Sequence, residues 1–106
     1  MDPHRLAEAR SLAYHRVIAE CILADPALVD AARVRIAEWR REGRMHEAYL
    51  AAWEALLAGP REALLASITA DDEAARALRQ TTPFAGALDP RERWAIHRAV
   101  AEQTQR

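Results

Sequence analysis

Three Asp-Pro pairs in the sequence each have the form of a helix start. They are Asp2-Pro3, Asp25-Pro26 and Asp89-Pro90. Aspartate at a helix start accepts a hydrogen bond from a backbone N–H of the first turn. Proline is tolerated at the first helical position because its missing N–H would have no partner there. Gly43 and the Gly59-Pro60 pair supply the opposite signal, since glycine often ends a helix and proline cannot continue one. These start and stop signals therefore predict a series of separate helices.

Between these signals, apolar residues recur three or four positions apart, as on one face of a helix. Leu28, Ala32, Ile36 and Trp39 form one such series. No run shows the alternation that is typical of a strand. We therefore predict an all-α fold, a compact irregular bundle of five or six short helices in a single helical domain over residues 1–106. The expected helices run from Pro3 to about Ala24, from Pro26 to Gly43, from Arg44 or Met45 to Gly59, from Pro60 to about Thr69, from Asp72 to Gln80 or Thr81, and from Pro90 onward.

The net charge of the chain argues against some classes of binding protein. The 106 residues carry a formal net charge of −1, and all 15 side chains counted as Lys or Arg are arginines. A net charge close to zero argues against bulk electrostatic attraction to nucleic acid or to an anionic membrane, although a local basic patch stays open. Each arginine carries a planar fork of donors that suits a carboxylate or a phosphate.

The lone cysteine, Cys21, lies on an apolar helical row and has no partner for an internal disulfide. This usage is typical of a core residue in a reducing compartment. The sequence contains neither a secretory signal nor an apolar run as long as a membrane span. We therefore expect a cytoplasmic protein that does not enter a membrane.

The segment from residue 76 to residue 94 is the one place where a helical pattern stops, a structured loop intervenes and a new helix begins. Pro83 disfavours a helical conformation at Thr82, and Gly86 permits backbone angles that other residues resist. We predict that Phe84, the only phenylalanine, is buried and anchors this loop to the core. The loop is then either a plain helix-to-helix connection or a binding loop. In the second case its accessible surface is expected to carry Arg79, Gln80 and Arg93.

Patterns for catalysis and metal binding are missing from the sequence. No two of the four histidines lie three or four residues apart, the spacing that places two ligands on one helical face. A site assembled across helices, for example from His15 and His97, has no support in the sequence. The serines lie inside helical patterns, and the acidic run at residues 71–73 is the expected complement of a helix macrodipole. We predict that the protein is not an enzyme and has no cofactor or metal.

The supply of tryptophan and arginine favours a binding protein. Three tryptophans are a high number for a chain of 106 residues. Tryptophan and arginine are also the residues that dominate interface hot spots. The densest basic stretch is residues 33–44, which a helical DNA-binding protein would use as its recognition surface, but Glu38 and Glu42 dilute it. The candidate partner-binding residues are Trp39, Arg40, Arg41, Arg44, Arg79, Gln80, Arg93 and Trp94.

Two stretches resemble a group of small, uncharacterised bacterial helical proteins. One is Arg-Ala-Leu-Arg-Gln-Thr-Thr-Pro-Phe-Ala-Gly at residues 76–86, followed by Pro-Arg-Glu-Arg at residues 90–93. The other is residues 11–20 together with the Asp-Pro-Ala-Leu start at residues 25–28. The group is associated with toxin–antitoxin loci, so the resemblance implies an antitoxin-like protein that binds a partner protein. It implies no catalytic residues. A DNA-binding transcriptional regulator that uses residues 33–44 is the alternative, and homodimerisation stays open.

Overall fold

The computed structural model describes residues 2–104, and within that range it contains six helices and no strand. This confirms the predicted all-α bundle. The helices are α1 (Pro3–Ala24), α2 (Ala27–Glu42), α3 (Glu47–Ala58), α4 (Arg61–Thr69), α5 (Glu73–Gln80) and α6 (Pro90–Thr104).

Most helix ends lie where the sequence predicts them. Gly43 ends α2 with a left-handed backbone, φ 64°, as expected for a glycine at this position. At the start of α6, the Asp89 carboxylate accepts from the Glu92 N–H at 2.9 Å, and the Asp89 N–H donates to the Glu92 carboxylate at 3.2 Å. This reciprocal pair is a capping box.

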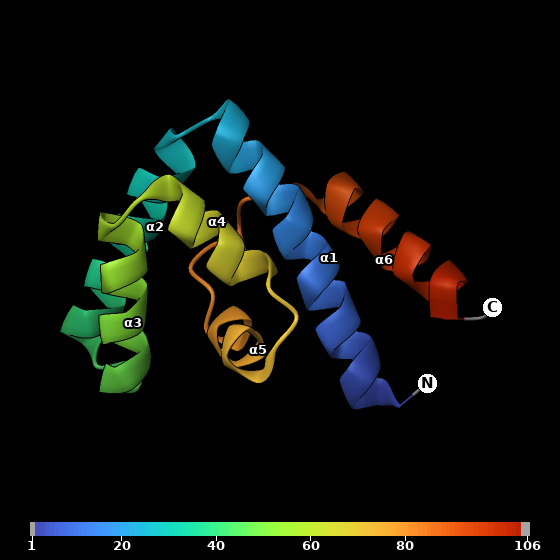
Figure 1. Cartoon of the computed structure of the whole chain (residues 1–106), viewed down its shortest axis with the longest axis horizontal. Coiled ribbons are helices and arrows are strands. Elements are labelled where there is room, and N and C mark those ends of the chain that lie inside the picture. Colours follow the sequence, from blue (N-terminus) through green and yellow to red (C-terminus); the bar gives the residue numbers. More distant parts are fainter. Residues whose placement is uncertain (1, 105–106) are drawn as a thin grey trace.

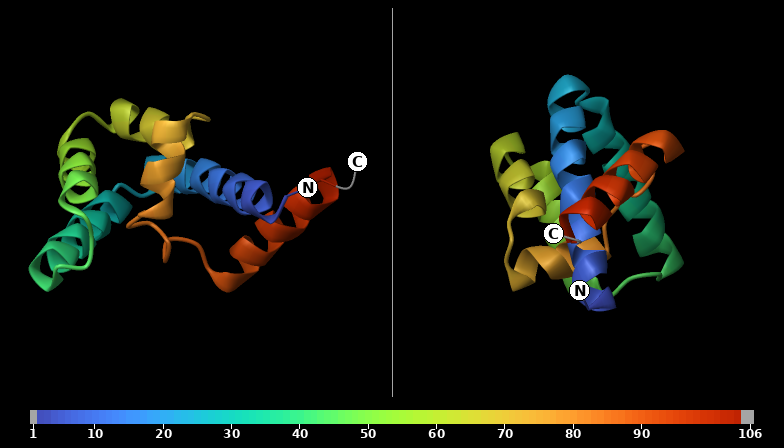
Figure 2. Two further views of the ribbon diagram at one scale, coloured as in Figure 1. Left: turned by 90° about the horizontal axis from the view of Figure 1, so that it is seen from below. Right: turned by 90° about the vertical axis from the view of Figure 1, so that its right-hand side faces the viewer.

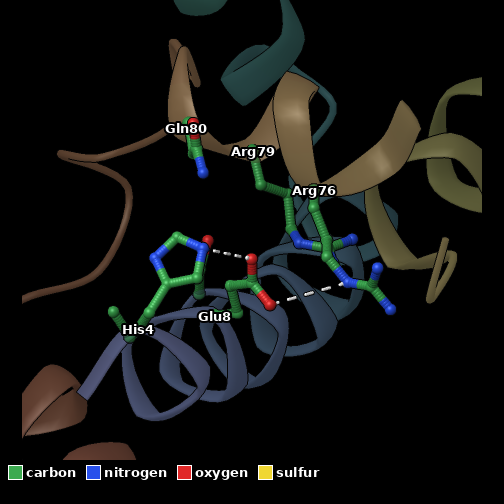
Figure 3. Close-up of a pocket in the computed structure, with 7 residues that line it drawn as sticks. His4, Glu8, Arg76, Arg79 and Gln80 are labelled. Atoms are coloured by element: carbon green, nitrogen blue, oxygen red, sulfur yellow. Dashed lines mark ion pairs between the residues drawn. The ribbon is translucent and has the colours of Figure 1, made fainter. Parts of the chain in front are cut away.

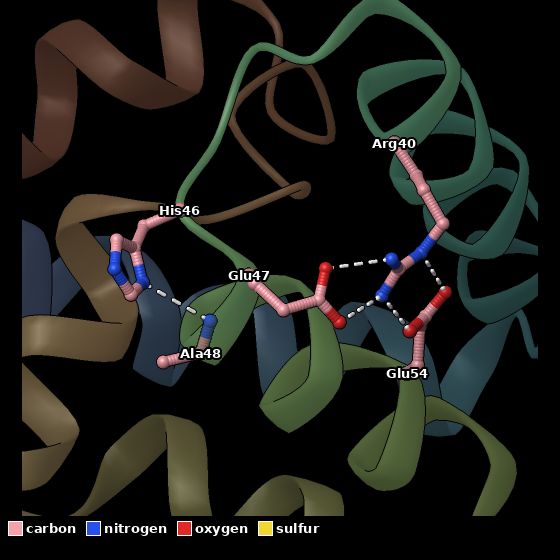
Figure 4. A network of polar contacts seen from close by, with 5 residues as sticks. All are labelled: Arg40, His46, Glu47, Ala48 and Glu54. Carbon is pink, nitrogen blue, oxygen red and sulfur yellow. Dashed lines mark hydrogen bonds and ion pairs between the residues drawn. The ribbon is translucent and has the colours of Figure 1, made fainter.

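The start of α3 was predicted two or three residues too early. The helix begins at Glu47, and His46 caps it, because its Nδ1 accepts from the Ala48 N–H at 3.1 Å (Figure 4). Histidine is not among the residues that usually cap a helix through the side chain. The sequence therefore offered no start signal at this position.

Helix α1 is the element around which the others are arranged. It packs against α2, α4, α5 and α6, while α2 pairs with α3 to form a hairpin that extends away from it (Figure 1). Helix α6 packs chiefly on α1 and lies on the opposite side of the molecule from the α2–α3 hairpin (Figures 1 and 2). Within residues 2–104, one long face of α6 therefore has no neighbouring helix.

The hydrophobic core lies where α1, α2, α3 and α4 meet. The Trp53 side chain is fully buried at its centre, and Cys21 packs against its edge, as its place on an apolar row predicted. Apolar burial of this kind is the main favourable term in folding. The buried core residues are Ile18, Ile22, Ala32, Ile36, Leu50, Trp53, Leu57, Leu64, Ile68, Phe84 and Leu88.

The connection between α5 and α6 is part of this core. Phe84 is 2 % exposed and packs edge-on against Trp53, with ring centroids 6.0 Å apart and planes at 68°. This is a favourable geometry for two aromatic rings. The Trp53 indole N–H also donates to the Thr81 hydroxyl oxygen at 3.0 Å. The prediction that Phe84 is a buried anchor is confirmed.

Polar contacts from two further helices hold the same connection. The Thr82 hydroxyl lies 2.9 Å from Nε2 of His15 on α1 and accepts from the Phe84 N–H at 3.1 Å. Arg35 on α2 donates from Nη1 to the Pro83 carbonyl at 3.1 Å. Buried backbone and hydroxyl groups need such partners, because leaving one unsatisfied costs about 1–3 kcal/mol.

The contacts of His15 indicate which tautomer its neutral ring adopts. Nδ1 lies 2.7 Å from the Ser11 carbonyl, which can only accept, so Nδ1 carries the proton. In a neutral ring, Nε2 then accepts from the Thr82 hydroxyl. Burial lowers the pKa of His15 more than the hydrogen bond to the Ser11 carbonyl raises it, and the positive charge of Arg79 lowers it further, so the neutral ring is favoured.

Truncation of the aromatic anchor tests this description of the connection. Phe84→Ala is expected to lower the free energy of unfolding by about 3–5 kcal/mol, because it removes a buried ring and leaves a cavity beside Trp53. Urea unfolding followed by far-UV circular dichroism measures this change. Leu23→Ala is the matched control, since Leu23 is 55 % exposed and its truncation should change the stability little. Equal effects of the two substitutions would contradict a buried Phe84.

Candidate functional site

The predicted partner-binding residues lie in three separate places. One group lies on α2 and just beyond its end, a second on the last turn of α5, and a third on the first turn of α6. Figure 1 shows that α2 and α6 are on opposite sides of the molecule. A single surface therefore cannot contain all three groups.

Arg40 belongs to the first group, and its guanidinium forms hydrogen bonds to two glutamates of α3 (Figure 4). Its guanidinium donates to the Glu54 carboxylate from Nε at 2.9 Å and from Nη2 at 2.6 Å. It donates to Glu47 from Nη1 at 2.7 Å and from Nη2 at 3.0 Å. The hydrogen bonds to Glu54 and then to Glu47 raise the pKa of Arg40, and they lower the pKa of both carboxyl groups. Arg40 thus joins α2 to α3.

Most other arginines between residues 33 and 44 also bind acceptors within the chain. Arg33 donates to the Leu57 carbonyl in the last turn of α3 and pairs with Asp30 at 2.7 Å. Arg44 pairs with Glu42 at 2.6 Å. Trp39 is half-buried and packs against the core, whereas Arg41 is exposed and has no ion pair among residues 2–104. Much of the positive charge that a DNA-binding helix would need is therefore already paired with acceptors within the chain.

The prediction that Arg79 flanks an accessible surface is wrong. The residue is 3 % exposed, and its Nη1 donates to the Ala70 carbonyl at 2.6 Å and to the Ile68 carbonyl at 3.3 Å. These carbonyls lie at the C-terminal end of α4, where helical carbonyls lack intrahelical donors and a positive charge is favourable. Arg79 therefore closes the end of α4, while its neighbour Gln80 is exposed.

A small pocket lies beside Arg79 and Gln80 (Figure 3). The Glu8 carboxylate in this pocket lies 3.1 Å from Nε2 of His4 and 3.8 Å from Nε of Arg76. The cavity measures about 90 Å³. Pockets that hold small molecules typically measure about 300–1,000 Å³. This pocket is therefore too small to be the candidate site.

The third group lies on α6 and is accessible. Trp94 is 60 % exposed, and its indole stacks on the His97 ring, with centroids 5.3 Å apart and planes at 12°. Val100 and Ile96 supply the apolar contacts of α6, being buried and half-buried respectively. Trp94 therefore lies outside the packed face of its helix, beside Arg93, which is also exposed.

Two adjoining hollows lie beside the contact between α1 and α6, and both are lined by Tyr14 and Arg93. The shallower one measures about 260 Å³ and includes Trp94 and His97. The deeper one, called here the α1–α6 cleft, measures about 370 Å³ and reaches His15. Among the described residues, no Asp or Glu lines either hollow. The polar residues of the α1–α6 cleft are Arg10, Ser11, Tyr14, His15, Thr82 and Arg93.

Sequence reasoning missed Arg10, Tyr14 and His97 as site residues. Tyr14 belongs to the apolar series of α1, which hid its position at the rim of a hollow. His97 follows Trp94 by three residues, a spacing that places two side chains side by side on a helix and could have indicated the stack. Arg10 offered no signal, because its place in the cleft depends on how residues 82–88 cross α1.

Comparison with known proteins adds no relative: no family model, curated protein or solved structure matches the chain. Within residues 2–104, no three His, Cys, Asp or Glu side chains gather where they could hold a metal ion. No helix in this part of the chain has both the length and the apolarity needed to cross a membrane. The candidate site is therefore defined by geometry alone, as the hollows between α1 and α6 and the exposed ring of Trp94.

The structural role of Arg79 can be tested by comparison with its neighbour. Arg79→Ala is expected to lower the free energy of unfolding by about 1.5–3 kcal/mol, because the variant loses charged hydrogen bonds to two carbonyls of α4. Gln80→Ala, on the same helical turn but exposed, should cost less than about 0.5 kcal/mol. Urea unfolding curves of the two variants check this difference. An unchanged unfolding midpoint for Arg79→Ala would contradict the structural role of Arg79.

Proposed function

We propose that the protein acts by binding a partner protein on the exposed face of α6, with Trp94 as the central contact residue. The observation that carries this proposal is the 60 % exposure of Trp94. A tryptophan ring presents a large apolar area, and tryptophan is among the residues that contribute most to protein interfaces. Burial of this ring by a partner is the simplest use of a side chain that folding leaves in water.

The surroundings of Trp94 support a binding role. The stacked His97 ring restricts the rotation of the indole, so less conformational entropy would be lost on binding. Arg93 lies next to it with no ion pair among the described residues, and arginine is also common in hot spots. The hollow at this face contains no carboxylate. A partner that presents an apolar side chain beside an acidic one fits this combination.

The kind of partner follows from the sequence resemblance. The stretches at residues 76–86 with 90–93, and at residues 11–20 with 25–28, resemble a group of small bacterial proteins associated with toxin–antitoxin loci, so the proposed partner is a toxin-like protein encoded nearby. The lone cysteine accords with a cytoplasmic setting. The competing function, DNA binding through residues 33–44, has weaker support because Arg33, Arg40 and Arg44 are paired within the chain.

Affinity purification with a Trp94 variant tests the proposal. The tagged chain, expressed in its native host together with its neighbouring genes, should retain a protein partner. Trp94→Ala should weaken this binding by at least about 2 kcal/mol, or roughly 30-fold in Kd, while far-UV circular dichroism stays unchanged.

The matched control for this experiment is Val34→Ala. Val34 is 59 % exposed and lies on α2, away from α6, so its truncation should leave partner binding unaltered. Recovery of the chain alone would contradict the proposed function. Equal loss of the partner in both variants would contradict the assignment of the binding face to α6. Recovery of a second copy of the chain, lost in Trp94→Ala, would identify the α6 face as a homodimer interface and contradict the toxin-like partner.

A further inference from the structure

The α1–α6 cleft has the size and the walls of a small-molecule site. Its volume of about 370 Å³ lies within the range of about 300–1,000 Å³ that ligand pockets occupy. One wall is α1, another is the connection at residues 82–88, and Arg93 on the first turn of α6 completes the site. Ile18 and Leu88 form an apolar floor, and both belong to the hydrophobic core.

The charges in the cleft are not balanced. Arg10 and Arg93 both line it, and no Asp or Glu does. Neither guanidinium forms an ion pair within residues 2–104, in contrast to Arg33, Arg40 and Arg76. The Arg10 Nε atom is buried and has no hydrogen-bond partner in the described part of the chain. Since nearly all buried donors in proteins are satisfied, an unsatisfied guanidinium nitrogen beside a cavity calls for an explanation.

The remaining polar groups of the cleft indicate binding without catalysis. Both ring nitrogens of His15 are engaged, with the Ser11 carbonyl and the Thr82 hydroxyl, so His15 is not free to act as a general base. The Thr82 hydroxyl is itself engaged by His15 and by the Phe84 N–H. The groups left for a ligand are the two guanidiniums, the Ser11 hydroxyl, the Tyr14 side chain and the apolar floor.

We infer that the α1–α6 cleft binds a small organic carboxylate, in which the anionic group pairs with Arg10 and Arg93 and an apolar body lies over Ile18 and Leu88. A guanidinium fork matches the two oxygens of a carboxylate, and the absence of competing acidic side chains leaves it available. The apolar floor favours a ligand with a single charged end over a compact inorganic anion. This site goes beyond the proposed partner binding, because the free chain should bind the ligand by itself.

Phenylacetate is a suitable probe, and phenylacetamide is its neutral counterpart of the same shape. In a ¹H–¹⁵N NMR titration of the full chain at millimolar ligand, phenylacetate should give saturable shifts centred on residues 10–15 and 82–88. Phenylacetamide should bind at least about tenfold more weakly, because it lacks the charge that strengthens hydrogen bonds to arginine. Equal binding of the two compounds, or no saturable shift with phenylacetate, would overturn the inference.

Substitution of the arginines locates the interaction. Arg10→Gln and Arg93→Gln should each weaken phenylacetate binding at least about tenfold, whereas Arg16→Gln, on the exposed side of α1, should leave it unchanged. Arg93 is exposed, so its variant tests the site even if Arg10→Gln fails to fold. Binding that survives both cleft substitutions, or that falls equally in Arg16→Gln, would overturn the assignment. A chain that binds phenylacetate but recovers no partner would separate this site from the proposed function.

Discussion

A connection that crosses the core of a helical bundle must have partners for its polar groups, and this requirement determines much of the structure. The connection from Thr81 to Leu88 meets it with side chains from three different helices. His15 on α1 forms a hydrogen bond with the Thr82 hydroxyl, and Trp53 on α3 donates one to the Thr81 hydroxyl. Arg35 on α2 donates to the Pro83 carbonyl. These bonds, together with the burial of Phe84, set the point at which α6 leaves the core and the direction in which it packs on α1. The α1–α6 cleft and the exposed position of Trp94 both depend on that placement.

The chain uses arginine for two different physical tasks. Arg33, Arg35 and Arg79 donate to backbone carbonyls where helices or loops leave acceptors unpaired. A forked guanidinium suits this task, since one side chain can satisfy several acceptors. The two arginines that line the α1–α6 cleft, Arg10 and Arg93, have neither such an acceptor nor an ion pair among the described residues. Arg41 also lacks an ion pair among the described residues, so the cleft is distinguished by having two such arginines on one hollow that no described carboxylate lines.

Local rules predicted the parts of the structure that depend on local interactions. Asp-Pro pairs and Gly43 predicted helix ends because capping involves residues close in sequence, and Pro83 with Phe84 predicted an anchored loop. The burial of Arg79 was missed because its acceptors, at the C-terminal end of α4, are nine and eleven residues away. Of the eight residues predicted to bind a partner, only Arg93 and Trp94 line the hollows between α1 and α6. The other residues of these hollows come together only when α6 packs on α1, which no periodicity in the sequence indicates.

Native-state hydrogen exchange tests most directly whether the connection at residues 81–88 is held as part of the core. The Phe84 N–H donates to the Thr82 hydroxyl, and the Ala87 N–H donates to the Phe84 carbonyl at 2.9 Å. If the connection opens only when the bundle unfolds, these two amides should exchange with nearly the same free energy of opening as the amide of Ile22 in α1. Exchange of both amides at the rate of an exposed loop, while Ile22 stays protected, would contradict this description and remove the structural basis for the cleft.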